Sequence, residues 1–263
     1  ACHISIGLDA RGPNNTIHQG DVSSLLAIEE AVRVLQREWA DVVLAGGASS
    51  QMDPYDWVRH CTLNTLSHRH DAPAGACRPF DAFRDGQVRG EGAAVFVLER
   101  ASHAQARGAT IFGRILSTAS ASEPYRQGRL PEGSALRRVI QQALQQAGLN
   151  TQGLGHINAH GLSTVEDDPL EAQVLHQVVP ETPVTAPKSF FGNLGAAGGA
   201  VEVAISLLGL MHGVIPPTLN YQNPDPACPV EVVHGSPEES IGPVLAINWN
   251  RTGQAAALIV SRD

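Results

Sequence analysis

The stretch Gly12–Ala31, GPNNTIHQGDVSSLLAIEEA, constrains the fold of this 263-residue chain more than any other. It predicts a turn at Gly12-Pro13, a short strand at Thr16–Ile17, a sharp bend at Gln19-Gly20 and then a long helix. Apolar residues spread around more than one face of that helix, which predicts burial on most sides. A strand that enters a buried helix through a tight bend presents one side chain above backbone amides, the geometry of a nucleophile elbow. The residue at this bend is Asp21.

Asp21 has two interpretations. Aspartate is among the favoured residues at a helix start, so its side chain can simply cap the helix amides. Alternatively, it occupies the reactive position of an elbow, although a carboxylate is no nucleophile for ordinary thioester chemistry. The bend alone leaves both interpretations open.

Strand-like and helix-like segments alternate along the rest of the chain. Ala40–Gly47 is a short apolar run ended by Gly-Gly, which predicts a buried parallel strand. A second apolar strand is expected at Ala93–Glu99. Ser134–Gly148 carries a single apolar stripe and predicts an amphipathic helix, with Ser134 placed to cap its start and Gly148 its end. This alternation predicts an α/β fold with helices on both faces of the sheets.

Two stretches carry a family resemblance. Ala76–Gly92, ACRPFDAFRDGQVRGEG, follows the pattern Arg-Pro-(Phe/Trp)-Asp-x-x-Arg-Asp-Gly-x-x-x-Gly-(Glu/Asp)-Gly almost throughout. The bend also fits, at Gly12, Pro13, Thr16, Ile17, Ser23 and Ser24. In both stretches the chain resembles the β-ketoacyl synthase family, whose catalytic cysteine falls on Asp21 here. The resemblance implies that the charged residues of Ala76–Gly92 build a buried hydrogen-bonded scaffold rather than do chemistry.

Later motifs extend the resemblance and imply the site. His160, in GHINAHGLST, falls on a family histidine. Lys188 and Asn193, in KSFFGNLGAAG, fall on the family lysine and on the position of its second histidine. Thr164 retains one of two threonines that hold a phosphopantetheine arm, whereas Leu162 replaces the other. The closing glycine-rich loop, whose phenylalanine gates the family's pocket, has decayed in residues 246–254.

The resemblance implies a thiolase-like fold, in which two related α/β halves stack as layers of α/β/α/β/α. Residues 1–109 would form the C-terminal part of the first half, which is incomplete in this chain, and residues 110–263 the second half. A homo- or heterodimer with a ketoacyl synthase is implied, as is contact with an acyl carrier protein whose phosphopantetheine arm carries the substrate. No bound cofactor is expected. Either the sequence is a fragment or a separate polypeptide completes the fold, because an unaccompanied chain would leave apolar sheet surface bare, which soluble monomers avoid.

Composition narrows the classes of function. A net charge of −8 argues against a dedicated nucleic-acid binder. Four scattered cysteines without a CxxC pair and the lack of a signal-peptide pattern predict a reducing, cytoplasmic setting. His68 and His70 lie in a polar loop without further ligands, so no metal site is expected. The apolar run Leu194–Met211 is interrupted by Glu202 and predicts a closely packed helix rather than a membrane span.

Two principal functions compete. Because a condensing synthase needs a thiolate to accept the acyl chain, Asp21 predicts a non-condensing homologue that resembles a chain length factor and pairs with a cysteine-bearing synthase. Whether any acyltransferase activity survives is left open. The alternative is a malonyl-thioester decarboxylase that uses His160 and Asn193 as donors to the developing enolate. A third hypothesis, hydrolysis with Asp21 as nucleophile, requires a covalent ester on Asp21.

Overall fold

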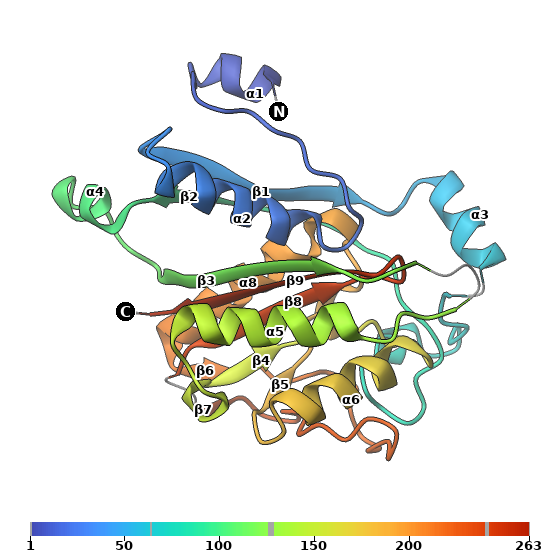
Figure 1. Cartoon of the computed structure of the whole chain (residues 1–263). Coiled ribbons are helices and arrows are strands. Elements are labelled where there is room, and N and C mark those ends of the chain that lie inside the picture. Colours follow the sequence, from blue (N-terminus) through green and yellow to red (C-terminus); the bar gives the residue numbers. More distant parts are fainter. Residues whose placement is uncertain (1, 64, 126–128, 240–241, 263) are drawn as a thin grey trace.

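The computed structural model, drawn in Figure 1, describes residues 2–63, 65–125, 129–239 and 242–262. The α-helices are α1 (Cys2–Gly7), α2 (Ser23–Gln36), α3 (Pro54–Thr62), α4 (Ala101–Ala106), α5 (Ser134–Ala147), α6 (Asp167–Val178), α7 (Lys188–Phe191) and α8 (Gly198–His212). The strands are β1 (Val42–Ser50), β2 (Glu91–Glu99), β3 (Arg114–Ser122), β4 (His156–Asn158), β5 (Val184–Thr185), β6 (Val214–Ile215), β7 (Glu238–Glu239), β8 (Val244–Trp249) and β9 (Gln254–Ser261). Short 3₁₀ turns are η1 (Pro73–Gly75), η2 (Thr151–Gly153) and η3 (Gly195–Ala197).

The main sheet has five strands in the order β3-β9-β8-β4-β5. β9 runs antiparallel to both β3 and β8, whereas β4 is parallel to β8 and β5. Every residue of β8 is buried, as are all residues of β9 after its first. Such continuous apolar strands are stable only when both faces of a sheet are covered. Here α5 covers one face of β9, and α2 and α8 lie against the other.

A second sheet contains only β1 and β2, which pair antiparallel from Val42↔Glu99 to Ser50↔Glu91. The expectation of a buried parallel strand at Ala40–Gly47 is therefore wrong. Neither outer edge of this sheet pairs with another strand among the described residues. The burial of β1 and β2 alternates because α2 and α8 pack on one face, whereas alternate side chains on the other face are exposed. An apolar run predicts a strand but not which strand will pair with it. It also does not predict whether the strand will lie at the edge of a sheet.

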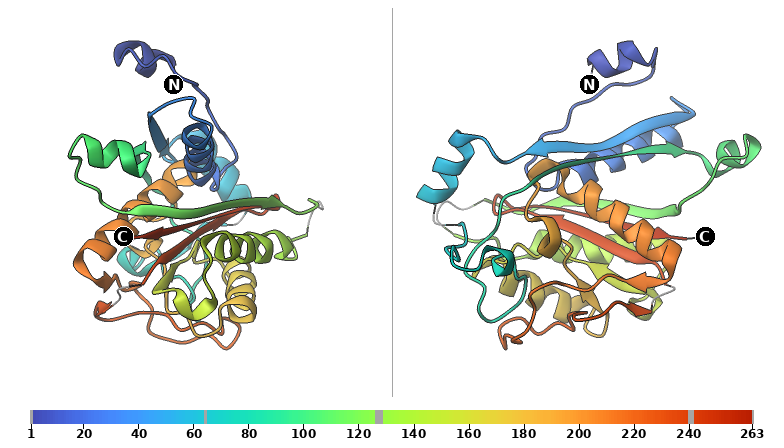
Figure 2. Two further views of the ribbon diagram at one scale, coloured as in Figure 1. Left: turned by 60° about the vertical axis from the view of Figure 1, so that its left-hand side comes forward. Right: turned by 180° about the vertical axis from the view of Figure 1, so that it is seen from behind.

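The two sheets enclose a helical layer. α2 packs on β1 and α8, and α8 contacts β2, β8 and β9, so both helices lie between the sheets. The further views in Figure 2 place α5 and α6 on the far side of the five-stranded sheet. The described chain thus stacks as α/β/α/β, and the outer helical layer expected over the first sheet is missing from it.

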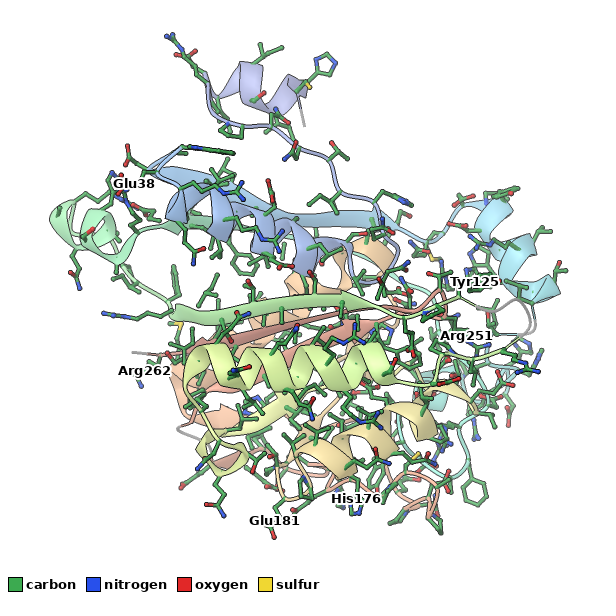
Figure 3. All side chains as sticks on the ribbon, in the orientation of Figure 1. Glu38, Tyr125, His176, Glu181, Arg251 and Arg262 are labelled. Atoms are coloured by element: carbon green, nitrogen blue, oxygen red, sulfur yellow. The ribbon has the colours of Figure 1, made fainter. Side chains whose placement is uncertain are left out.

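An apolar cavity of about 1070 Å³ opens between the two sheets on the β2 side. Val95, Val97 and Phe112 contribute to its lining together with residues of α2, α8 and α4. Glu38, which Figure 3 labels near α4, lies at its edge and forms an ion pair with Arg100 at 3.1 Å. The side of β2 away from β1 is therefore open and apolar.

The helix expected at Ser134–Gly148 is confirmed, with one correction at its start. Gly148 ends α5 in the left-handed conformation, at φ +66°, as the glycine predicts. The side chain of Ser134 does not cap the helix. Instead, the carboxylate of Glu123 accepts the amides of residues 132–134, the first of them at 3.2 Å. A capping group eleven residues away in sequence leaves no local signal.

The segment before the bend contains a second correction. Thr16 and Ile17 do not form a strand, because no neighbouring strand lies beside them in the described chain. α1 extends away from the two sheets, and its Ile4 and Ile6 are exposed.

One helical segment, residues 195–212, is long and apolar enough to pass a length-and-hydropathy test for a membrane span. More than half of it is buried, and α8 packs between the two sheets. Its buried Gly199 leaves room for Ser24 and Asn248, since a Cβ there would meet the Asn248 oxygen at 2.3 Å. The prediction of a closely packed core helix agrees with this position.

Candidate active site

The bend before α2 places Asp21 at the helix entrance without capping it. Gly20 adopts a left-handed φ of +58°. The hydroxyl of Ser23 donates to the Gly20 carbonyl (2.6 Å) and accepts the Gln19 amide (2.8 Å), so Ser23 closes the bend. The N-cap position is Val22, and no side chain caps the helix there. The structure therefore favours the elbow interpretation of Asp21 over the capping one.

Asp21 faces residues from three other segments. Burial raises the pKa of Asp21, and the charge of Lys188, a hydrogen bond from Asn193 and the charge of Arg89 partly oppose that effect. Asp167 raises the pKa further. Asp21 is thus next to Asn193 and within electrostatic reach of two cations, yet burial favours its neutral form.

His160 follows β4 as the sequence predicts, and its contacts define the position of its proton. Its Nδ1 lies 3.1 Å from Nζ of Lys188 and 3.2 Å from Nδ2 of Asn248. Both are donors, so Nδ1 accepts and Nε2 carries the hydrogen. Nε2 is buried and has no partner in the described chain. Burial and the charge of Lys188 hold the pKa of His160 well below its usual range, so the ring is a neutral N–H donor.

A buried polar network holds Lys188 and His160. Nζ of Lys188 pairs with the carboxylate of Glu202 on α8. Nδ2 of Asn248, on β8, donates to the other Glu202 oxygen at 2.7 Å. Nδ2 of Asn158 donates to the Glu202 carbonyl at 2.9 Å. Sequence reasoning missed Glu202 and Asn248 as site residues; the only signal was a charge within an apolar run.

The side-chain amide of Asn193 forms hydrogen bonds with other groups of the protein. Its Nδ2 donates to Oε1 of Gln87 at 2.9 Å, and its Oδ1 accepts the amide of Gly195 at 2.9 Å. The hydrogen bond to Asp21 uses the same side chain. The amide is therefore engaged by groups of the protein, and its role toward a ligand stays a prediction.

The hydroxyl of Thr164 is also engaged. It donates to Oδ2 of Asp167 at 2.8 Å and accepts the Asp167 amide at 3.0 Å, at the start of α6. Nε of Arg251, labelled in Figure 3, donates to the same carboxylate at 2.8 Å. Contact between Thr164 and a phosphopantetheine arm remains a prediction. Leu162, which replaces the other family threonine, is buried and offers no hydroxyl to such an arm.

None of the four cysteines stands at the bend of residues 19–21. All four cysteines are free, and Cys2 and Cys61 are exposed on α1 and α3. Cys77 lies closest to the site, with its thiol donating to the Lys188 carbonyl at 3.1 Å. Burial raises the pKa of Cys77 to about 12, so its reactive thiolate form is scarce at neutral pH.

The motif at Ala76–Gly92 forms the expected scaffold. Asp81 is fully buried and accepts Nε of Arg78 at 3.0 Å and the amides of Gln222 and Asn223 at 2.8 Å each. Arg84 pairs with Asp225 at 2.6 Å. These bonds tie the motif to the chain after β6.

Two family descriptions match the chain. "Beta-ketoacyl synthase, N-terminal domain" matches residues 1–104, and "Beta-ketoacyl synthase, C-terminal domain" matches residues 112–222. The chain belongs to the β-ketoacyl synthase family.

Two relatives and one solved structure show the extent of the match. A putative polyketide β-ketoacyl synthase 1 of Streptomyces virginiae is 34% identical over 99% of this chain, which spans 63% of that relative. A 3-oxoacyl-[acyl-carrier-protein] synthase 2 of Coxiella burnetii is 34% identical over 98% of the chain, which spans 64% of it. The ishigamide ketosynthase/chain length factor superposes over the whole chain with a TM-score of 0.92 at 26% identity, and the chain spans 64% of that structure. The fold is therefore thiolase-like, and this ketoacyl synthase chain is less than two thirds as long as these proteins.

The closing segment of this ketoacyl synthase homologue lies beyond the second matched region. Residues 246–254 belong to β8, a turn and the start of β9. Nδ2 of Asn250 donates to the Gln19 carbonyl at 3.0 Å, and its Oδ1 accepts the amides of Thr252 and Gln254. The altered loop therefore forms a tight turn that braces the bend.

Proposed function

We propose that this protein is a non-condensing ketoacyl synthase homologue of polyketide or fatty-acid synthesis. It would pair with a cysteine-bearing synthase and shape that enzyme's pocket, as a chain length factor does. The observation that carries the proposal is the carboxyl of Asp21 at the bend, held by Asn193 and accompanied by no accessible thiolate. Carboxylate attack on a thioester would give a reactive mixed anhydride, so stable acyl transfer to this position is not expected.

The exposed first sheet is a surface that a partner, or a further segment of polypeptide, would cover. Val95 and Val97 are 65% and 58% exposed, and Val42 and Leu44 are exposed on the neighbouring strand. Contiguous apolar surface of this kind marks a protein interface. The similarity to a ketosynthase/chain length factor is consistent with a synthase as that partner, and an acyl carrier protein would deliver the substrate on its phosphopantetheine arm.

One observation favours malonyl-thioester decarboxylation as a second candidate. Nε2 of His160 is an unpartnered N–H donor of the type that stabilises an enolate oxygen. One feature opposes it, because the Asn193 amide is already engaged within the protein. Asp21 would repel a malonyl carboxylate about 4 Å away by roughly 4 kcal/mol at an effective dielectric near 20 only in its ionised form, which burial disfavours.

The discriminating experiment incubates the protein with malonyl-carrier protein, alone and with a cysteine-bearing synthase from the same gene cluster. We expect no turnover by the protein alone and product formation by the pair. Acetyl-carrier formation by the protein alone, abolished by His160→Ala, would support the decarboxylase and overturn the preferred function.

Acylation at the bend provides a direct test of the non-condensing role. After incubation with an acyl-pantetheine thioester, intact-mass measurement should show no added acyl group on the native protein. Asp21→Cys, which places a thiol at the bend next to Asn193, should gain one acyl mass. A hydroxylamine-labile ester mapped to Asp21 in the native protein would contradict the proposal.

A further inference from the structure

Arg89 lies where the candidate active site meets α3. Its backbone is held against Asn193, because the Asn193 amide donates to the Val88 carbonyl at 2.7 Å and the Gly90 amide donates to the Asn193 carbonyl at 2.9 Å. The side chain is partly buried. The family pattern leaves the three positions between Gly86 and Gly90 unspecified, so the motif does not predict Arg89.

The guanidinium of Arg89 uses little of its hydrogen-bonding capacity. Its Nη1 makes one long contact, 3.5 Å, with Oε1 of Gln87, which already accepts Asn193. Its Nε is buried and has no partner among the described residues. A guanidinium has five N–H donors, and a buried donor without a partner costs about 1–3 kcal/mol. Within the part of the chain that the structure describes, no group binds the edge formed by Nε and Nη2.

In two other arginines of this chain, the edge formed by Nε and Nη2 binds a carboxylate. Arg11 holds Asp9 through Nε at 3.1 Å and Nη2 at 3.0 Å. Arg107 holds Glu99 through Nε at 2.8 Å and through Nη2. Two parallel N–H groups match the two oxygens of a planar carboxylate. The free edge of Arg89 has the same complementarity.

Several carboxylates lie near Arg89, but none of those in the described chain forms an ion pair with its guanidinium. Asp21, Asp53 and Asp56 all act on the pKa of Arg89, but none of them forms an ion pair with it in the described chain. Asp53 instead caps α3, accepting the Tyr55 amide at 3.0 Å. Burial favours the neutral form of Asp21, which reduces its repulsion of an entering anion. Arg89 thus lies among Asp21 at the bend and the acidic residues at the start of α3, and its Nε has no partner in the described chain.

We propose that Arg89 is a specificity-determining residue that binds the carboxylate of a small acid or acyl group entering between the bend and α3. The contact would use the Nε–Nη2 edge, as in the Arg11 and Arg107 pairs. This site does not depend on the pairing proposed above, because every group that forms it belongs to this chain.

Calorimetric titration of the protein with malonate, at low ionic strength, tests the proposal. Malonamide serves as the uncharged isostere and inorganic phosphate as a tetrahedral anion. We expect malonate to bind the native protein, and Arg89→Gln to weaken it by about tenfold or more, as for loss of a charged hydrogen-bonded contact. Malonamide should not bind measurably.

Arg59→Gln is the matched control. Arg59 is exposed on α3 and acts on Arg89 through its charge, so this variant removes an equal charge and should change the malonate affinity less than twofold. Arg89→Lys retains the charge but not the planar edge, and should weaken binding even if Arg89→Gln proves unstable. No malonate binding by the native protein, equal losses in the Arg89 and Arg59 variants, or tighter binding of phosphate than of malonate would overturn the proposal.

Discussion

The two sheets of this molecule bury the same kind of residue to very different degrees. Helix–strand–strand units of similar form occur in both, α2–β1–β2 in the first and α8–β8–β9 in the second. In the second, β4 and β3 pair with the outer edges of β8 and β9, and all of β8 is buried. In the first, both outer edges are open, and alternate valines of β2 are exposed.

The difference teaches that the candidate active site depends on the completed sheet. His160, Lys188, Glu202 and Asn248 all lie on or beside the second unit, where a low-dielectric interior strengthens their mutual interactions. The first unit contributes Asp21 and leaves its outer surface for another protein segment. Stability changes should therefore be large in the second unit and small in the first.

Lys188→Met should have the largest effect on stability. It leaves Glu202 buried and unpaired, which costs about 3–5 kcal/mol of unfolding free energy. Urea denaturation monitored by circular dichroism measures the change. Lys188→Met with Glu202→Leu removes both charges and should recover much of the loss; no recovery would mean that the pair is not the dominant contact of Lys188.

The sequence predicts a site residue more reliably when the residue belongs to a recognisable motif than when packing of distant elements brings it to the site. His160 and Lys188 were found because the motif residues stand in order after a strand and before a helix, and the structure brings them within 3.1 Å. Glu202 was read only as an interruption of an apolar helix, and Asn248 lay in a decayed motif. Both residues belong to the site because they contact side chains from other elements of the fold, and a local sequence pattern does not predict such contacts.

The fold shows the same limit. The helices α5 and α8 have clear local signals, whereas the parallel pairing expected for β1 and the strand expected at Thr16–Ile17 are wrong. A strand depends on its neighbour, and the neighbour is not encoded in the strand itself. Edge exposure in the first sheet could not be read from Ala40–Gly47 for that reason.

The same substitution in both sheets compares their burial directly. Val260→Ala, at a fully covered position of β9, should lower the unfolding free energy by roughly 2 kcal/mol through lost burial and a cavity. Val97→Ala, on the open side of β2, should change it by less than about 0.5 kcal/mol in the isolated chain. Chemical denaturation of both variants gives the two values. Repetition with a bound synthase sharpens the comparison, since a larger cost for Val97→Ala there would show that the partner covers β2.

The pH dependence of the unfolding free energy should also differ between groups of the first unit and groups of the second. Burial raises the pKa of Glu171, on α6 beside the second sheet, from 4.5 to about 8. Folding therefore favours the neutral carboxyl, and the stability that this group contributes at low pH is lost as the pH rises through 8. Hydrogen bonds from Arg107 and His103 lower the pKa of Glu99, at the end of β2, to about 2, so its contribution is present above pH 4.5 and is lost only as pH falls toward 2. Between pH 5 and 8 the unfolding free energy should fall by roughly 1 kcal/mol or more, since one pKa unit corresponds to about 1.4 kcal/mol.

Glu171→Gln tests that assignment. It removes the titrating group but keeps an oxygen for one of the two backbone amides, those of His160 and Gly161, that donate to Glu171. The slope of unfolding free energy against pH should flatten in this range. An unchanged slope would mean that another group causes the pH dependence. Asp168 would then be replaced next, because burial raises its pKa to about 7.

The smallest effect is expected at the open edge of the first unit. Arg100 pairs there with Glu38 and Asp41, and all three side chains are substantially exposed. Arg100→Gln should lower the unfolding free energy by less than about 1 kcal/mol, because solvent screens such pairs and ordering the side chains opposes the attraction. The difference from the native protein should shrink further in 1 M NaCl, where the Debye length is about 3 Å, whereas the loss caused by Lys188→Met should persist. A loss at Arg100 that equals the loss at Lys188 and resists salt would show that the first unit is as closely packed as the second, and the contrast between the two sheets would no longer explain where this molecule keeps its buried charges.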